Sequence, residues 1–163
     1  MKFSYTKLLL LVTIIGSLLF TACKKSSSGP GSPVIATVNG TAYQATATTA
    51  IHTTSFQAVW VESYQLTAGD SIYLEIDIPD TALVNKPLVV GNIGVDIEYQ
   101  DTKAGYKGYY GGYIGSSHGT ITLSGRDTTN HKIAGTFNAV LYNNDNDSIK
   151  ITNGVFNTSY SLQ

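Results

Sequence analysis

The sequence predicts an all-β domain, and three observations lead to this class. From Val34 onward, no segment of more than ten residues shows the 3.6-residue apolar repeat of a helix. Apolar and polar residues instead alternate with a period of two, which is the pattern of half-buried antiparallel strands. Turn-forming residues separate these segments at short intervals. We therefore expect an antiparallel β-sandwich of eight or nine strands, with a closed or half-open, lipocalin-like meander barrel as the alternative.

Five strands are expected in the first half of the domain. Asn39-Gly40 predicts a hairpin between the first two, because both residues tolerate the positive φ angles of a type I′ turn. The fourth strand shows the alternation most clearly, since isoleucine or leucine stands at each even position from Ile72 to Ile78. A helical turn is expected only in residues 79–85. The five strands are residues 34–38, 41–50, 55–66, 71–78 and 93–99.

Four further strands are expected in the second half. Residues 127–130 and 143–147 are rich in aspartate and asparagine, which are turn-forming residues. Asn153-Gly154 interrupts the last apolar alternation and predicts a bulge or a tight turn. The four strands are residues 106–114, 119–125, 132–142 and 148–158. The large aromatic residues expected in the core are Phe56, Trp60, Phe137 and Phe156.

Residues 1–22 have the composition of a secretory signal peptide. Lys2 and Lys7 precede an apolar run over residues 8–19, which is shorter than the roughly 20 residues of a membrane-spanning helix. The run leads into Phe-Thr-Ala-Cys23, which resembles the lipobox of bacterial lipoproteins, where the cysteine receives a lipid and cleavage follows. We therefore predict cleavage before Cys23 and a stable membrane anchor on it.

Behind the predicted cleavage point lie a tether and one domain. Residues 23–33 consist mainly of serine, glycine, proline and lysine, and this composition predicts a flexible tether. The domain then occupies residues 34–163. Cys23 is the only cysteine of the chain, so an internal disulfide is impossible and its lipidation accounts for its presence.

The residues also resemble a known group of proteins. The features that carry the resemblance are Cys23-Lys-Lys, the hairpin Val38-Asn-Gly-Thr-Ala-Tyr43, and the closing segments 119–125, 133–137 and 149–156. They are similar to small lipoproteins of Bacteroidetes-type bacteria whose function is unassigned. The resemblance covers both ends of the domain, and its motifs are turns and strands. It implies a location and a fold, and it carries over no functional residue.

Charge and anchor together predict the location and the partners. The net charge is −1, and no basic patch points to nucleic acid. The lipid predicts a cell-envelope protein on the outer membrane, with a glycan or an envelope protein as partner. Surface lipoproteins of such bacteria often carry acidic residues after the cysteine, whereas Lys24 and Lys25 follow it here. The surface and the periplasmic side both remain open.

The sequence holds none of the common catalytic signatures, so we expect no enzymatic activity and no cofactor. His52, His118 and His131 lack the close spacing of a zinc site. Residues 143–148 are rich in oxygen ligands but lack the glycine and glutamate of a calcium loop, so no metal is expected. The acid pairs of residues 75–77 and 96–98 are expected on the solvent face of their strands. A hydrolase built on them is the less favoured alternative, and it requires two acids across a cleft, at least one of them buried and with a raised pKa.

The stretch of residues 105–115 is the most unusual part of the sequence, because glycine and tyrosine dominate it. Tyrosine rings beside glycines are expected to remain uncovered, where a sugar ring or a protein partner can stack on them. Aromatic cover over strand glycines is the alternative interpretation. The predicted ligand-binding face comprises Tyr106, Tyr109, Tyr110 and Tyr113.

These observations predict a non-catalytic binding or structural module of the cell envelope. Two alternatives stay open besides the hydrolase. The first is a glycan-binding module that uses the tyrosine-rich stretch. The second is a barrel that binds a small lipophilic ligand in an enclosed cavity.

Overall fold

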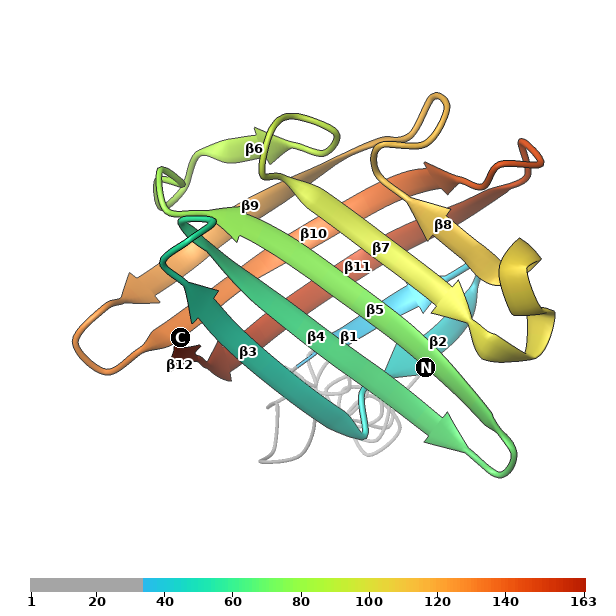
Figure 1. Cartoon of the computed structure of the whole chain (residues 1–163), viewed down its shortest axis with the longest axis horizontal. Helices are drawn as coiled ribbons and strands as arrows, with labels where there is room; N and C mark the ends of the chain where they lie inside the picture. Colours follow the sequence, from blue (N-terminus) through green and yellow to red (C-terminus); the bar gives the residue numbers. More distant parts are fainter. Residues whose placement is uncertain (1–33) are drawn as a thin grey trace, which may run out of the picture.

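The computed structural model describes residues 34–163, apart from the side chains of residues 105–107, and it shows an all-β fold (Figure 1). The predicted fold class is therefore confirmed. Twelve strands belong to one open sheet, whose pairs are antiparallel except that β12 runs parallel to β3. The strands are β1 (Val34–Val38), β2 (Thr41–Gln44), β3 (Ala47–Thr53), β4 (Ala58–Thr67), β5 (Asp70–Pro79), β6 (Pro87–Val89), β7 (Asp96–Asp101), β8 (Tyr109–Gly111), β9 (His118–Asp127), β10 (Lys132–Tyr142), β11 (Ser148–Ser159) and β12 (Ser161–Leu162).

The sheet folds over on itself and forms two layers. Its hydrogen-bonded order is β12-β3-β4-β5-β7-β8-β10-β11-β1-β2, and β9 lies between β10 and β6. In Figure 1 the layer of β3, β4, β5 and β7 crosses the layer of β9, β10, β11 and β1, and one hydrophobic core joins both. The short strand β8 links the layers, because it pairs with β7 and, at one position, with β10. The two layers are thus halves of one sheet. The sheet is open, so the closed-barrel alternative is wrong.

Two connections bring the ends of this sheet together. Ala45 and Thr46 lead from β2 into β3, and the Thr46 amide donates to the Tyr64 carbonyl of β4 at 2.8 Å. At the opposite end, Tyr160 leads from β11 into β12, and its amide donates to the His131 carbonyl at 2.8 Å. The chain therefore crosses from one layer to the other at both of these points.

Most of the predicted strands and turns are present. Asn39 and Gly40 have φ angles of 47° and 82°, so the expected two-residue hairpin turn between β1 and β2 is confirmed. The bulge at Asn153-Gly154 is also confirmed, because Asn153 has a φ of 54° and the pairing of β10 with β11 shifts there. Residues 143–147 form the expected hairpin turn, in which the Asn143 amide donates to the Asp147 carbonyl at 3.0 Å.

The stretch 102–114 differs from its prediction. A 3₁₀ helix, η1, occupies Thr102–Gly108, and only Tyr109–Gly111 forms a strand. The Lys103 amide donates to the Asp101 side chain at 2.9 Å, and this local hydrogen bond begins the turn that ends β7. The helical turn expected in residues 79–85 is reduced to isolated turns. The short strands β6 and β12 were not predicted from the sequence.

Two of the four predicted core aromatics lie in the core. Phe137 and Phe156 are 2% and 1% exposed, and glycines at 154 and 135 leave space for their rings. Phe56 is 69% exposed, so its predicted burial is wrong. Trp60 is half-buried on the outer face, because it alternates with Val59 and Val61, which point inward. The rings of Phe56 and Trp60 pack against each other outside the core, with their centroids 5.2 Å apart.

Candidate functional site

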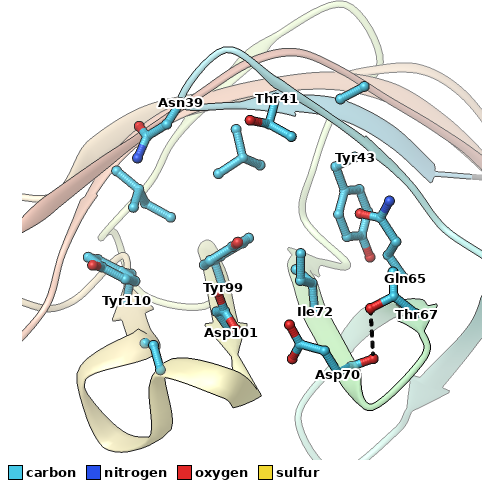
Figure 2. A pocket seen from close by; sticks show the side chains of 15 residues that line it. Asn39, Thr41, Tyr43, Gln65, Thr67, Asp70, Ile72, Tyr99, Asp101 and Tyr110 are labelled. Atoms are coloured by element: carbon cyan, nitrogen blue, oxygen red, sulfur yellow. Dashed lines mark hydrogen bonds between the residues drawn. The ribbon is translucent and has the colours of Figure 1, made fainter.

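On each strand the inward-facing residues form a row that points into the core. A cleft opens between the layers at the end of these rows (Figure 2). The core side chains of these rows give way to polar ones at this mouth, as from Ile72 to Asp70 on β5 and from Tyr99 to Asp101 on β7. The cleft has a volume of about 540 Å³. Its lining residues are Val38, Asn39, Thr41, Ala42, Tyr43, Gln65, Thr67, Asp70, Ile72, Tyr99, Asp101, Ala104, Gly108, Tyr110 and Ile149.

Two tyrosines form one wall of the cleft. Tyr99 and Tyr110 are directly paired across β7 and β8, and their ring centroids lie 6.2 Å apart at an interplanar angle of 59°. Figure 2 shows Asn39 and Thr41 of the β1–β2 hairpin facing these rings across the hollow. Burial raises the pKa of Tyr99 to about 12, so its hydroxyl stays protonated at neutral pH.

A third tyrosine fixes the opposite wall. Tyr43 is 2% exposed, and its hydroxyl lies 2.9 Å from the Ser63 hydroxyl of β4, which in turn donates to the Leu74 carbonyl. This contact connects β2 to the other layer. The wall is therefore held in place by a buried hydrogen-bond chain instead of by packing alone.

The polar rim is held by hydrogen bonds between neighbouring elements. The Thr102 hydroxyl at the start of η1 lies 3.1 Å from Asp70 Oδ1 and 2.9 Å from the Ser71 carbonyl, and its single hydrogen can be donated to either oxygen. The Asp101 carboxylate accepts from the Lys103 amide, as described above. Both carboxylates are thus positioned before any ligand arrives.

The described residues that line the cleft carry negative charge only. They include Asp70 and Asp101, and none of them is lysine, arginine or histidine. Burial, followed by the nearby carboxylates of Asp147 and Asp101, raises the pKa of Tyr110. The side chain of Lys150 in β11 is exposed on the face opposite Ile149, so it points away from the cleft.

The structure separates the four tyrosines predicted as one binding face. Tyr110 lines the cleft, whereas Tyr109 lies on the outer face, where its hydroxyl hydrogen-bonds Glu98. Tyr113 is 56% exposed, and its hydroxyl donates to the Asn92 carbonyl at 3.0 Å. Tyr106 belongs to η1, and its side chain lies outside the described part of the chain. Sequence reasoning missed Tyr99 and Asp101, although the alternation of residues 93–99, extended by two residues, places both on the inner face.

A second hollow of about 490 Å³ lies near the carboxyl end of β11. It is lined by His52, Asp80, Ala82, Arg126, Thr128, His131, Tyr160 and Leu162. Asp80 contacts two cationic or ionisable partners here, His52 Nε2 at 2.8 Å and the Arg126 guanidinium. These hydrogen bonds outweigh the opposing effect of desolvation and lower the pKa of Asp80. The fold thus brings His52 and His131 to the two sides of Tyr160, whereas His118 lies elsewhere.

The acid pairs expected on the solvent face form a row across three strands. Glu62, Glu75 and Glu98 are directly paired on β4, β5 and β7, beside the pair of Asp77 and Asp96. Contrary to expectation, Asp96 is only 3% exposed, and its Oδ1 accepts from the Ile97 amide at 2.7 Å. Burial, together with the charge of Glu75, raises the pKa of Asp77 to about 8. None of these five residues lines either hollow described above.

The described residues contain no group of three or more histidines, cysteines or acids placed to hold a metal ion. Within the same part of the chain, no helix is long and apolar enough to span a membrane. Cys23 and the predicted signal peptide lie outside the described residues. No protein-family model, no curated protein and no solved structure matches this chain.

Proposed function

We propose that this protein is a lipid-anchored, non-catalytic module of the cell envelope that binds a saccharide in the cleft beside Tyr99 and Tyr110. The observation that carries the proposal is the pair of tyrosine rings in a hollow of about 540 Å³ with a polar rim. This volume is in the ordinary range of small-molecule sites.

The side chains of the cleft match the two kinds of surface that a sugar ring presents. The C–H face of a sugar packs on an aromatic ring, and its hydroxyls pair with carboxylates and amides. Tyr110 offers a partly exposed ring, while Asn39, Gln65, Asp70 and Asp101 offer acceptors and donors around it. The glycan-binding alternative is therefore retained, and its site keeps Tyr110 of the four predicted tyrosines and adds Tyr99.

The location belongs to the same proposal. Lipidation of Cys23 and the tether of residues 23–33 place the domain at a membrane surface of the envelope, on the outer membrane. The cleft is then free to take a glycan from this compartment. We propose no nucleic-acid partner, because the net charge of −1 offers no electrostatic attraction to phosphates.

A small lipophilic ligand is the second candidate. The observation that favours it is the apolar side of the cleft, to which Val38, Ile72 and Ile149 contribute. Such a ligand would fill the same space as a sugar and would compete with it.

The test is a glycan-array screen of residues 24–163, which keep the tether and the domain without the lipid. We expect binding to a defined set of glycans. An excess of an environment-sensitive lipophilic dye, added as a competitor, is expected not to displace these glycans. Displacement of the dye by fatty acids, with no glycan bound, would instead support the second candidate and refute the first.

A further inference from the structure

The cleft has a charge that selects among saccharides. Its described lining contains two carboxylates, Asp70 and Asp101, and no cationic side chain. Lys103 in η1 is exposed and is not among the residues that line the cleft, although its backbone amide donates to Asp101. An acidic sugar entering this space would therefore meet repulsion without a compensating partner.

The same groups form a receptor for a positive charge. An ammonium group has three donors and no acceptor, so carboxylate oxygens are its natural partners. Asp101 directly continues the inward row of Tyr99 on β7, and Asp70 continues that of Ile72 on β5. The rings of Tyr99 and Tyr110 line the same cleft as Asp101, and the faces of aromatic rings attract cations.

We infer that the saccharide bound by this cleft carries a free amino group, as glucosamine units do, and that Asp70 and Asp101 select it over neutral and acidic sugars. This inference rests on the proposed function, because it specifies the ligand of the same site. Burial is the main cause of the raised pKa values of Tyr99 and Tyr110, and the nearby carboxylates add to both.

Two oligosaccharides of equal length test the inference: the glucosamine tetramer and its N-acetylated form, which is neutral. Calorimetric titration of residues 24–163 at low salt is expected to give an affinity about tenfold higher for the glucosamine tetramer, the effect of one charged hydrogen bond. High salt is expected to reduce this difference, because it screens exposed charges.

Asp101→Asn and Asp70→Asn test the assigned residues. Asparagine keeps an oxygen that can accept from the Lys103 amide or the Thr102 hydroxyl, so both variants are expected to fold. Each is expected to remove most of the preference for the glucosamine tetramer, because its affinity for the variants falls about tenfold further than that of the N-acetylated tetramer. Glu62→Gln is the matched control, because it removes the same charge from the outer face.

Equal affinity for the two tetramers, or a preference that survives both aspartate variants, would overturn the inference. So would a failure of both tetramers to bind. The proposed function is judged separately, since a positive glycan array shows saccharide binding even when the tetramers bind equally or not at all.

Discussion

Tyr99 and Tyr110 stand directly opposite each other on β7 and β8, and their rings line the same cleft 6.2 Å apart. Tyr109, the neighbour of Tyr110, points to the other side of the sheet and bonds Glu98. Two adjacent tyrosines of the glycine-rich stretch thus belong to different surfaces. This division separates the predictions for the cleft from those for the outer face.

The acidic outer face is expected to make the domain more stable as the pH falls from about 8 to about 4. The pKa of Asp77 is raised to about 8 in the folded state, so the folded protein keeps a proton that the unfolded chain loses near its ordinary value of 3.8. The stability that Asp77 contributes is therefore fully present below pH 3.8 and is lost as the pH rises toward 8. Urea unfolding across this range measures the effect, and an unchanged midpoint would contradict it.

Asp77→Asn is expected to raise the free energy of unfolding at neutral pH and to flatten this pH dependence. At neutral pH the unfolded wild-type chain gains free energy because Asp77 ionises on unfolding, and asparagine removes this gain. The expected stabilisation is on the order of the 1.4 kcal/mol that one pKa unit represents. Glu62→Gln is the control on the same row. Destabilisation by Asp77→Asn would show that the charged form of Asp77 has a favourable partner.

Asp80 holds the second hollow together. Asp80→Ala is expected to destabilise the domain by about 1–3 kcal/mol, because the Arg126 guanidinium loses its side-chain partner while it remains mostly buried. A double-mutant cycle with His52→Ala isolates the contact between His52 and Asp80. Additive effects of the two substitutions in thermal unfolding would mean that this contact contributes nothing to stability.

The glycines under the core rings are expected to tolerate no side chain. A Cβ at Gly154 would lie 2.6 Å from the Phe137 ring, and one at Gly135 would lie 2.6 Å from the Phe156 ring. Gly154→Ala and Gly135→Ala should each cost about 1–3 kcal/mol, the usual effect of overpacking a core. Gly125→Ala is the matched control, since nothing lies within 4 Å of its Cβ position. Equal unfolding temperatures for the three variants would contradict this packing.

Lipidation is predicted at Cys23. The protein in its native host is expected in the membrane fraction, with a mass that shows acyl chains on the N-terminal cysteine. Cys23→Ser should abolish the lipid and the cleavage that depends on it. A processed, unlipidated protein recovered from the wild-type gene would identify an ordinary signal peptide instead.

Strand alternation and turn-forming residues predicted much of the fold, because both depend on residues that are neighbours in the sequence. Period-two alternation identified β1 and β10 with their observed bounds, and Asn39-Gly40 predicted its turn. The prediction of a strand was wrong in the stretch that contains η1. Glycine and tyrosine alternate there as in a strand, but this pattern does not show whether a neighbouring strand is available for pairing. There the Lys103 amide donates to the Asp101 side chain, and the chain turns into η1 directly after this residue.

The sites were harder to predict because they depend on distant contacts. His52 and His131 meet across Tyr160 only because β12 crosses over to pair with β3. No periodicity in the sequence encodes that crossing. The cleft, in contrast, lies where the inward-facing residues of several strands end, and the alternation within β5 and β7 placed Ile72 and Tyr99 on the inner face.

Comparison of Tyr110→Ala with Tyr109→Ala tests the central claim most directly. The two variants remove neighbouring rings, one from the cleft and one from the outer face, and unfolding curves are measured first to check that each variant is folded. With a glycan identified on the array, we predict that Tyr110→Ala weakens binding at least tenfold, the effect of one lost aromatic contact of about 1.4 kcal/mol, while Tyr109→Ala binds like the wild type. Loss of binding in Tyr109→Ala alone would place the site on the outer face and contradict the account.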